Sequence, residues 1–254
     1  MKQRVIISIV NQKGGVGKTT TAINIAALLA KKFSVLLVDL DSQANATSGL
    51  GFQKGQAIPS TYQLLMDPSI TLSKVARRTS YQHLKIVCSD SNLSGAEVEL
   101  VSRPNREFVL KSAIETSNYD YVIIDCPPSL GLLTINALTA ASHVLIPVQT
   151  EYYALEGLSQ LLNTIQAVKR STNPDLEILG VLMTMFDSRN ALSGQVRKEI
   201  DNYFNELVFK TVIPRNVRLA EAPSFGKTIF EYDKRSKGSK AYKSLTNEII
   251  IRMS

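Results

Sequence analysis

The chain has 254 residues, of which 44% are hydrophobic and 20% charged, as is ordinary for a soluble globular protein. No apolar run reaches the ~20 residues that a membrane-spanning helix needs, and the apolar start of the chain runs into glycines without a signal-peptide cleavage site. The two cysteines, Cys88 and Cys126, form no metal-ligand cluster and favour the reducing cytoplasm. The net charge of +7 is compatible with a polyanionic partner, and basic residues gather in the C-terminal third.

Apolar runs rich in Val, Ile and Leu alternate with stretches of helical periodicity along the chain. The strand-like runs cover residues 4–10, 35–40, 84–88, 121–125, 143–148 and 178–186. Continuous apolar runs of this length predict parallel strands that are buried on both faces. The alternation predicts an α/β fold, in which a doubly wound, mostly parallel sheet carries helices on both faces and binds ligands at the carboxyl ends of its strands. Since no repeat or linker interrupts the pattern, a single domain over residues 1–254 is predicted.

The first strand-like run leads into the sequence NQKGGVGKTT, residues 11–20. Glycines let the backbone curl so that successive N–H groups point at phosphate oxygens, and the helix that follows turns its positive end towards the same charge. Lys18 would bridge the β- and γ-phosphates of ATP, and the Thr19 hydroxyl would ligate Mg²⁺. The pattern predicts a P-loop NTPase, with a plain glycine turn as the weaker alternative. The predicted phosphate-binding residues are Lys13, Gly14, Gly15, Val16, Gly17, Lys18, Thr19 and Thr20.

A second lysine, Lys13, stands at the start of the same loop. Two ammonium groups of one chain would repel each other in one phosphate pocket, so Lys13 and Lys18 are not expected to share it. Lys13 would be useful if it reached a γ-phosphate across a dimer interface, where it would neutralise charge as an arginine finger does. From the loop alone, a solvated lysine is an equal alternative.

Carboxylates follow two of the strand-like runs. Asp39 and Asp41 close the second run, and because residues two apart on a strand point the same way, both are predicted beside the phosphate loop. Such a pair could also be a metal site by itself. Asp125 ends the fourth run and is interpreted as the Walker B carboxylate that holds Mg²⁺ directly or through water, with a helix cap as the alternative. Cys126 is predicted to be a packed small residue, and the two prolines after it favour a switch-like loop.

Five segments, in this order, resemble the ParA/Soj/MinD superfamily of deviant Walker A ATPases. They are KGGVGKTT (13–20), VLLVDLDSQANATSGLG (35–51), YVIIDCPPSLG (121–131), PVQTEYYALEGL (147–158) and IPRNVRLAEAPSFGK (213–227). Together they span almost the whole chain, and they are most similar to the small chromosomal ParA (Soj) proteins, which segregate DNA with a ParB partner. Because the chain begins at its first strand, the N-terminal helix-turn-helix extension of larger plasmid ParA proteins is not expected.

The resemblance implies a chromosome- or plasmid-partitioning ATPase with ATP and Mg²⁺ as cofactors. Asp41 would position or polarise the attacking water and Asp39 would support the site, while Lys13 would act across a homodimer that ATP closes. The superfamily usually has a proline after the second aspartate, where this chain has Ser42. The residues expected against the adenine ring are Pro214, Arg215 and Asn216.

The resemblance also implies two macromolecular partners. Arg189 and Arg218 match arginines that Soj-like proteins use to bind double-stranded DNA regardless of sequence, since phosphate contacts carry no base information. Two surface arginines without a ligand are the alternative. A ParB-like partner protein would stimulate hydrolysis and release the dimer from DNA. The expected location is therefore the cytoplasm, on the nucleoid, without a membrane partner.

Other functions of the same fold are weaker interpretations. A MinD-like membrane-cycling ATPase would need a C-terminal amphipathic helix that enters lipid. The tail 241–254 instead has a few spaced apolar residues and no Phe or Trp, which predicts the last packed helix of the fold. Electron transfer of the nitrogenase-reductase kind needs paired cluster cysteines that the sequence lacks. Amide-forming synthetases have the same loop but do not account for the ParA-type segments.

Overall fold

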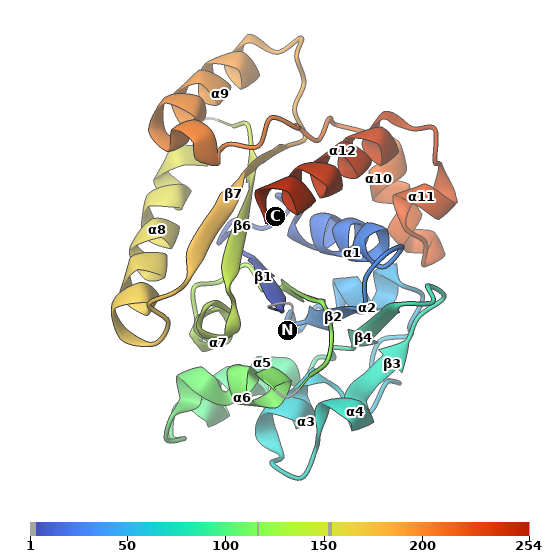
Figure 1. Cartoon of the computed structure of the whole chain (residues 1–254), viewed down its shortest axis with the longest axis vertical. Helices are drawn as coiled ribbons and strands as arrows, with labels where there is room; N and C mark the ends of the chain where they lie inside the picture. Colours follow the sequence, from blue (N-terminus) through green and yellow to red (C-terminus); the bar gives the residue numbers. More distant parts are fainter. Residues whose placement is uncertain (1–3, 116, 152–153, 254) are drawn as a thin grey trace.

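The computed structural model describes residues 4–115, 117–151 and 154–253. In these residues seven strands form one sheet in the order β3-β4-β2-β5-β1-β6-β7, with helices on both sides (Figure 1). Neighbouring strands pair in parallel, except that β3 runs antiparallel to β4. The strands are β1 (Val5–Ile9), β2 (Val35–Asp39), β3 (Ala76–Arg78), β4 (Leu84–Val87), β5 (Tyr121–Asp125), β6 (His143–Gln149) and β7 (Glu177–Thr184).

Helices connect successive strands, except that a short turn joins β3 to β4, and they continue the chain after β7. The α-helices are α1 (Lys18–Leu29), α2 (Asn45–Gly49), α3 (Thr61–Met66), α4 (Leu72–Val75), α5 (Leu93–Leu100), α6 (Val109–Glu115), α7 (Leu132–Ala140), α8 (Ala154–Ser171), α9 (Ala191–Phe204), α10 (Val217–Glu221), α11 (Ile229–Tyr232) and α12 (Lys237–Arg252). The described ranges also contain three short 3-10 helices: η1 (Arg106–Phe108), η2 (Asn205–Leu207) and η3 (Ala222–Phe225).

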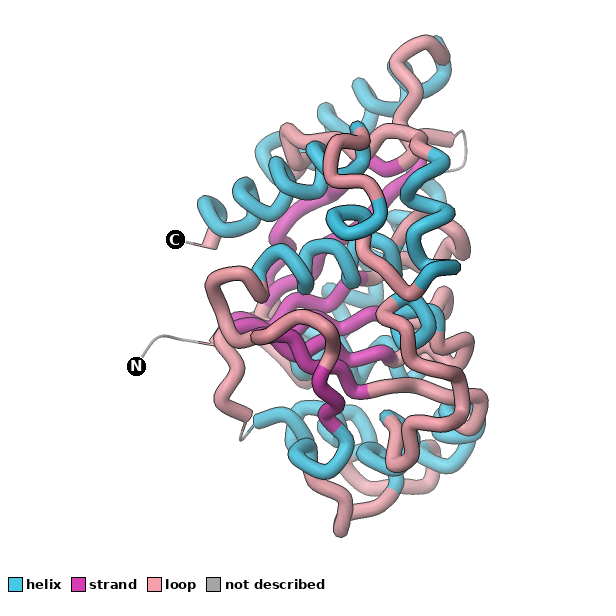
Figure 2. Tube along the Cα trace, turned by 90° about the vertical axis from the view of Figure 1, so that its right-hand side faces the viewer, coloured by secondary structure: helices cyan, strands magenta, loops and turns pink. Residues whose placement is uncertain are grey.

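Each face of the sheet has its own hydrophobic core, because successive strand residues point to opposite faces. Ile6 and Ile7 of β1 lie in different cores, and so do Val122 and Ile123 of β5. One core is closed by α3 and by α5 to α9, and the other mainly by α1 and α12. Figure 2 shows the strands enclosed between these two helical layers. The doubly wound α/β fold predicted from the sequence is confirmed.

The C-terminal helix α12 belongs to the second core. Tyr242, Leu245 and Ile249 are fully buried, and the Tyr242 hydroxyl forms a hydrogen bond of 3.1 Å with that of Thr21 in α1. The prediction of a last packed helix is confirmed. Leu245 and Ile249, which would have to enter lipid in a membrane-binding tail, are instead buried in the core. Among the helices of the described ranges, none is long and apolar enough to cross a membrane.

Candidate functional site

The glycine loop connects β1 to α1 at the carboxyl edge of the sheet. Gly15 and Gly17 have φ angles of 75° and 87°, in the left-handed region that glycine adopts without steric cost. A Cβ atom placed on Gly14 or Gly15 would meet no other atom within 4 Å. The loop therefore borders open space with its backbone exposed, as a phosphate cradle requires.

Hydrogen bonds to the neighbouring strands β6 and β7 hold this loop. The Asn11 amide donates to the carbonyl of Pro147 in β6 at 2.7 Å, and its oxygen accepts from the Lys13 N–H at 2.9 Å. The Thr184 hydroxyl at the end of β7 donates to the Val16 carbonyl at 2.8 Å. The loop is thus fixed by strands far away in sequence, which sequence reasoning did not reveal.

Lys18 begins α1 and lies almost entirely inside the loop. It is 6% exposed, and its Nζ donates to the Lys13 carbonyl at 3.1 Å. Burial lowers the pKa of Lys18, while the charges of Asp125, Cys126 and Asp41 oppose that shift. A buried ammonium inside a glycine loop is a suitable partner for phosphate oxygens.

Asp125 lies beside Asp39, because β2 and β5 are adjacent and their registers align these two residues. Asp125 is fully buried, and neither of its carboxylate oxygens accepts a well-formed hydrogen bond from a described residue, although the Thr19 hydroxyl lies near enough to act on the carboxylate. Burial raises its pKa well above the usual value, the charge of Asp39 adds to the rise, and the Thr19 hydroxyl opposes it. A buried carboxylate without a partner is costly, so its environment is suited to a cation.

The donors at this point fit Mg²⁺. Asp125 and the Thr19 hydroxyl provide the hard oxygen atoms that Mg²⁺ prefers, and such sites commonly use one or two protein ligands together with substrate phosphates and water. Within the part of the chain that the structure describes, no group of three or more His, Cys, Asp or Glu residues could hold a metal by itself. That result does not test a pair of two residues, so the metal site predicted as an alternative at Asp39 and Asp41 stays a prediction.

Asp39 is bonded within the chain through both carboxylate oxygens. Oδ1 accepts from the Asp41 N–H at 3.2 Å, and Oδ2 accepts from the N–H and the hydroxyl of Thr47 at 2.8 and 2.6 Å. Burial raises the pKa of Asp39 to about 6, against the effect of the Thr47 hydrogen bonds. These contacts agree with the predicted supporting role of Asp39; its contact with a nucleotide remains a prediction.

Asp41 follows on the loop between β2 and α2, and it is 8% exposed. Its Oδ1 accepts from the Gln43 N–H at 2.9 Å. Its charge acts on both Lys18 and Asp125, so the structure brings the three predicted groups together at one edge. Cys126 is buried, as predicted, and burial raises the pKa of its thiol well above the usual value.

Lys13 is paired with a carboxylate at the surface, whereas Lys18 is buried inside the loop. Its Nζ forms an ion pair with Glu151 Oε2 at 2.5 Å, between side chains that are 42% and 47% exposed. The expectation that the two lysines do not share a pocket agrees with this arrangement. Its reach across a dimer interface remains a prediction.

The predicted adenine segment lies next to the end of β7. Phe186 and Pro214 form an isolated parallel bridge, and the Arg215 N–H donates to the Phe186 carbonyl at 3.2 Å. Asn216 caps the start of α10, and its side-chain oxygen accepts from the Arg218 N–H at 2.9 Å. The segment thus reaches the same edge as the phosphate loop, which Thr184 of β7 also contacts.

Both predicted DNA-binding arginines are paired with carboxylates of their own chain. Arg189 donates to both oxygens of Asp187, at 3.0 and 2.8 Å, with a side chain that is 88% exposed. Arg218 donates to Glu221 at 2.9 Å, and its guanidinium lies 6.0 Å from the Tyr232 ring centre. The bridge between Phe186 and Pro214, just after β7, joins the two segments that carry these arginines.

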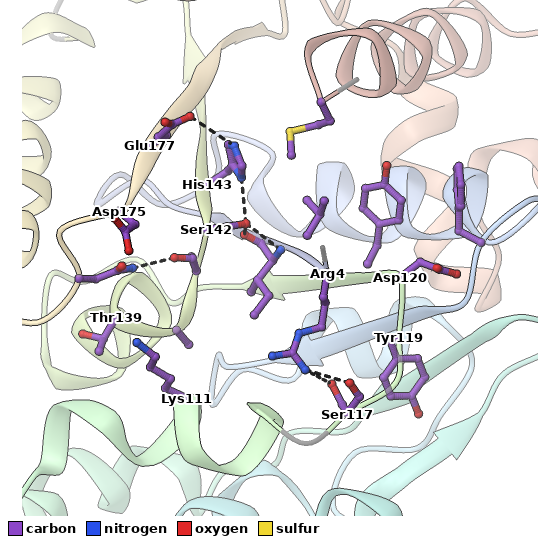
Figure 3. Close-up of a pocket in the computed structure, with 18 of the residues that line it drawn as sticks. Arg4, Lys111, Ser117, Tyr119, Asp120, Thr139, Ser142, His143, Asp175 and Glu177 are labelled. Atoms are coloured by element: carbon purple, nitrogen blue, oxygen red, sulfur yellow. Dashed lines mark hydrogen bonds and ion pairs between the residues drawn. The ribbon is translucent and has the colours of Figure 1, made fainter. Parts of the chain in front are cut away.

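A groove of about 1070 Å³ lies at the opposite, amino edge of the sheet. In Figure 3, His143 lies between Ser142 and Glu177, with nitrogen–oxygen distances of 2.9 and 3.6 Å. Arg4 donates to Ser117 and to carbonyls at the end of α6. The groove lies away from the glycine loop and the aspartates, and parallel α/β sheets bind ligands at the other edge. We therefore assign the chemistry to the carboxyl edge.

A glycine cradle, a buried lysine and a partnerless carboxylate at the carboxyl edge of a doubly wound sheet define a P-loop nucleotide-binding protein. Residues 4–178 match the sequence profile of a family described as AAA domain. The chain is 55% identical to the sporulation initiation inhibitor protein Soj of Bacillus subtilis over 249 residues, 96% of this chain and 97% of the relative. It is 53% identical to the chromosome partitioning protein ParA of Myxococcus xanthus, over 97% of this chain and 88% of that one. The chain belongs to the ParA/Soj family of partitioning ATPases.

A solved structure extends the comparison to bound ligands. The cobyrinic acid a,c-diamide synthase of Mycobacterium smegmatis, with bound ADP and magnesium, has a TM-score of 0.85 and 38% identity, and the match covers 99% of this chain and 96% of the synthase. An amide-forming enzyme thus has a similar fold. This agrees with the sequence analysis, in which amide-forming synthetases are a weaker alternative because they have the same loop. The higher identity to the partitioning proteins agrees with the interpretation of the ParA-type segments.

Proposed function

We propose that the chain is a DNA-partitioning ATPase, a single domain whose ATP-bound homodimer binds DNA regardless of sequence and is released when a ParB-like partner stimulates hydrolysis. The observation that carries the proposal is the buried Asp125, which has no hydrogen-bond partner among the described residues and lies close to Lys18 beside the open glycine loop. Family membership supports the same conclusion. ADP and magnesium in the related synthase support ATP and Mg²⁺ as the cofactors.

Each residue at the carboxyl edge has a distinct part in this proposal. The loop N–H groups and Lys18 bind and orient the phosphates, and the adenine ring lies against the segment 214–216. Thr19 and Asp125 hold Mg²⁺, which supplies positive charge against the phosphates. Asp41 orients the attacking water, since its carboxylate lies at the same edge and is held on a short loop.

The homodimer explains the second lysine. Lys13 is kept out of its own phosphate pocket, which Lys18 fills, and its ammonium is half exposed at the surface of the loop. An exposed ion pair contributes at most about 1 kcal/mol, so Glu151 can release Lys13 at little cost. A phosphate of the partner's nucleotide then offers Lys13 a higher density of negative charge.

DNA binding is assigned to exposed arginines. Arg189 and Arg218 are on the surface and lie near the end of β7, and a dimer doubles the number of phosphate contacts they can make. Such contacts ignore sequence, as a protein that acts on a whole nucleoid in the cytoplasm requires. The MinD-like alternative has no comparable support, because α12 is buried against α1.

Equilibrium binding to arbitrary duplex DNA and to anionic liposomes, each with ADP and with ATP, tests the proposal. We expect tight DNA binding with ATP but not with ADP, and no comparable binding to liposomes with either nucleotide. Lys18→Ala is the matched control, since it removes the phosphate contact and leaves both arginines in place. DNA binding that is independent of the nucleotide, or liposome binding that exceeds it, would overturn the proposal.

A further inference from the structure

Thr47, on the short helix α2, has a fully buried hydroxyl that joins three parts of the chain. Thr47 is 0% exposed. Its hydroxyl donates to Asp39 Oδ2 at 2.6 Å and accepts from the Ser89 N–H at 2.9 Å. Asp39 ends β2 and Ser89 follows β4, so this single hydroxyl links α2 to the ends of two neighbouring strands.

The same contacts close the loop that carries Asp41. The Asp39 carboxylate accepts from the Asp41 N–H at one end of the loop and from the Thr47 N–H at the other. Both ends of the segment 41–47 are therefore bound to one side chain. We call this arrangement the Asp39–Thr47 clamp.

The loop inside the clamp has a conformation that needs support. Ala44 has φ 51° and ψ 42°, in the left-handed region, which residues with a Cβ atom adopt unfavourably. Its N–H donates to the Asp41 carbonyl at 2.9 Å, and the Asp41 carboxylate accepts from Gln43. Strained backbone of this kind persists where surrounding contacts enforce it, and the clamp supplies those contacts.

We propose that Thr47 is a positioning residue for ATP hydrolysis, whose hydroxyl fixes the loop so that the Asp41 carboxylate is held ready to orient the attacking water. The inference rests on the proposed role of Asp41. Thr47 does not touch the nucleotide in this account, and it acts through Asp39 and the loop. Its loss should therefore slow hydrolysis and leave ATP binding intact.

Thr47→Val removes the hydroxyl and nearly preserves the side-chain volume, and Thr61→Val is its matched control. Thr61 is also 0% exposed, and its hydroxyl bonds to the carbonyls of Asp39 and Cys88 at 2.8 and 3.1 Å without contacting the carboxylate. We expect Thr47→Val to lower kcat roughly 10- to 100-fold, as small misplacements of catalytic groups do, with KM for ATP within about twofold. Thr61→Val should keep kcat close to that of the wild type.

Thr47→Ser tests the hydroxyl directly, because it keeps the donor and loses only a methyl group. It should restore most of kcat. If Thr47→Val does not fold, Thr47→Cys replaces it, since a thiol is similar in size and a much weaker donor. A serine variant as slow as the valine or cysteine variant, or a fall in kcat that Thr61→Val matches, would overturn the proposal.

Hydrogen exchange separates this inference from the proposed function. In the nucleotide-free chain, the amides of Asp41 and Thr47 should exchange at least about tenfold faster in Thr47→Val than in Thr61→Val, since a local opening speeds exchange by the factor its equilibrium changes. Equal exchange in the two variants overturns the clamp whatever the kinetics show. If the clamp is seen by exchange while Asp41→Ala still hydrolyses ATP, the role proposed for Asp41 is wrong, and with it the link from Thr47 to hydrolysis.

Discussion

Two regions of the molecule differ in whether their charged groups are paired within one chain. The first, the nucleotide edge, is the carboxyl edge of the sheet with the glycine loop, Lys18 and Asp125. The second, the arginine segments, is the pair of segments that carry Arg189 and Arg218. At the edge, Lys18 is 6% and Asp125 0% exposed, and hydrogen bonds with β6 and β7 hold the glycine loop. The two arginines are exposed, and carboxylates of the same chain pair with them: Asp187 with Arg189, and Glu221 and Asp233 with Arg218. The edge has a buried carboxyl group without a well-formed hydrogen bond, which a bound cation would satisfy, whereas the arginines already have carboxylate partners.

This difference indicates where binding energy comes from at each place. A preorganised, buried site gains most of its interaction from a single ligand, because little has to reorganise. An exposed arginine that must first leave a carboxylate gains little, so useful affinity needs several arginines acting together. ATP binding is thus expected to occur in one chain, and DNA binding to depend on assembly.

The largest effect is expected for Lys18→Ala. It removes the buried ammonium that the phosphates require, so productive ATP binding or turnover should be abolished, with at least about a 100-fold loss of activity. Asp41→Ala should instead keep ATP binding and lose hydrolysis, which traps the dimer. Fluorescent-nucleotide titration and phosphate release measure the two steps separately. Wild-type turnover by Asp41→Ala would contradict the role given to that residue.

Gly14→Val addresses assembly. A Cβ on Gly14 meets no atom within 4 Å of this chain and Gly14 does not have a positive φ, so the monomer should fold and bind nucleotide. A branched side chain should block the close approach of two loops, and Lys13→Ala should remove the charge that acts across the interface. Light scattering should then find monomers with ATP. A mass that is the same with ADP, with ATP and in Asp41→Ala would contradict the ATP-dependent dimer.

Much of the nucleotide edge could be predicted from sequence because its determinants are local. The run 121–125 and the glycine loop each contain their own strand or turn preference, and β5 has the predicted bounds. The edge strand β3, with the sequence Ala-Arg-Arg, was missed because it is short, polar and antiparallel. Thr47 was missed because its role depends on contacts with β2 and with the segment after β4, which no local pattern encodes.

Asp125→Asn sharpens the contrast by measuring the cost of the unpartnered charge. The folded pKa of Asp125 is raised, so its contribution to stability is present at low pH and is lost as pH rises through that raised pKa. Without ligands, the variant should be more stable than wild type at pH 7.5 by about 1 to 2 kcal/mol. The gain should shrink at pH 5, because a lower pH favours the neutral carboxyl form of wild-type Asp125. Urea unfolding at both pH values measures this.

A control for that experiment is Asp175→Asn, which removes an exposed carboxylate and changes the net charge equally. It should not alter stability by more than a few tenths of a kcal/mol. Equal effects of the two variants on the free energy of unfolding, or a gain that grows at pH 5, would contradict this prediction. Burial of the Asp125 carboxylate would then not lower the stability of the folded chain.

Charge reversal tests the arginine segments. Arg189→Glu and Arg218→Glu should weaken ATP-dependent DNA binding severalfold, and each lost phosphate contact should lower the log–log salt slope by about 0.9. ATP binding and dimerisation should continue, because neither arginine contacts the glycine loop in the described structure. If charge reversal leaves the DNA affinity unchanged, both residues are solvated surface arginines without a ligand.

The smallest effect, and the one that addresses the comparison most directly, is expected for Asp187→Asn. The hydrogen bonds from Arg189 lower the pKa of Asp187 to about 2, so the carboxylate stays charged and paired across the working pH range. The asparagine oxygen can still accept from the Arg189 N–H, as Oδ1 does at 3.1 Å, and the guanidinium is released from its ion pair. DNA affinity with ATP should rise about two- to fivefold, as expected for removing an exposed ion pair, equally at pH 6 and pH 8.

The double variant decides whether that gain comes from Arg189 or from net charge alone. In an Arg189→Gln background, Asp187→Asn no longer has a guanidinium to release, so the gain should disappear. A gain of the same size in both backgrounds would show that one less negative charge is enough to strengthen binding. The pair with Asp187 would then have no part in keeping the single chain off DNA, and the contrast between a satisfied arginine surface and an unsatisfied nucleotide edge would not hold at this position.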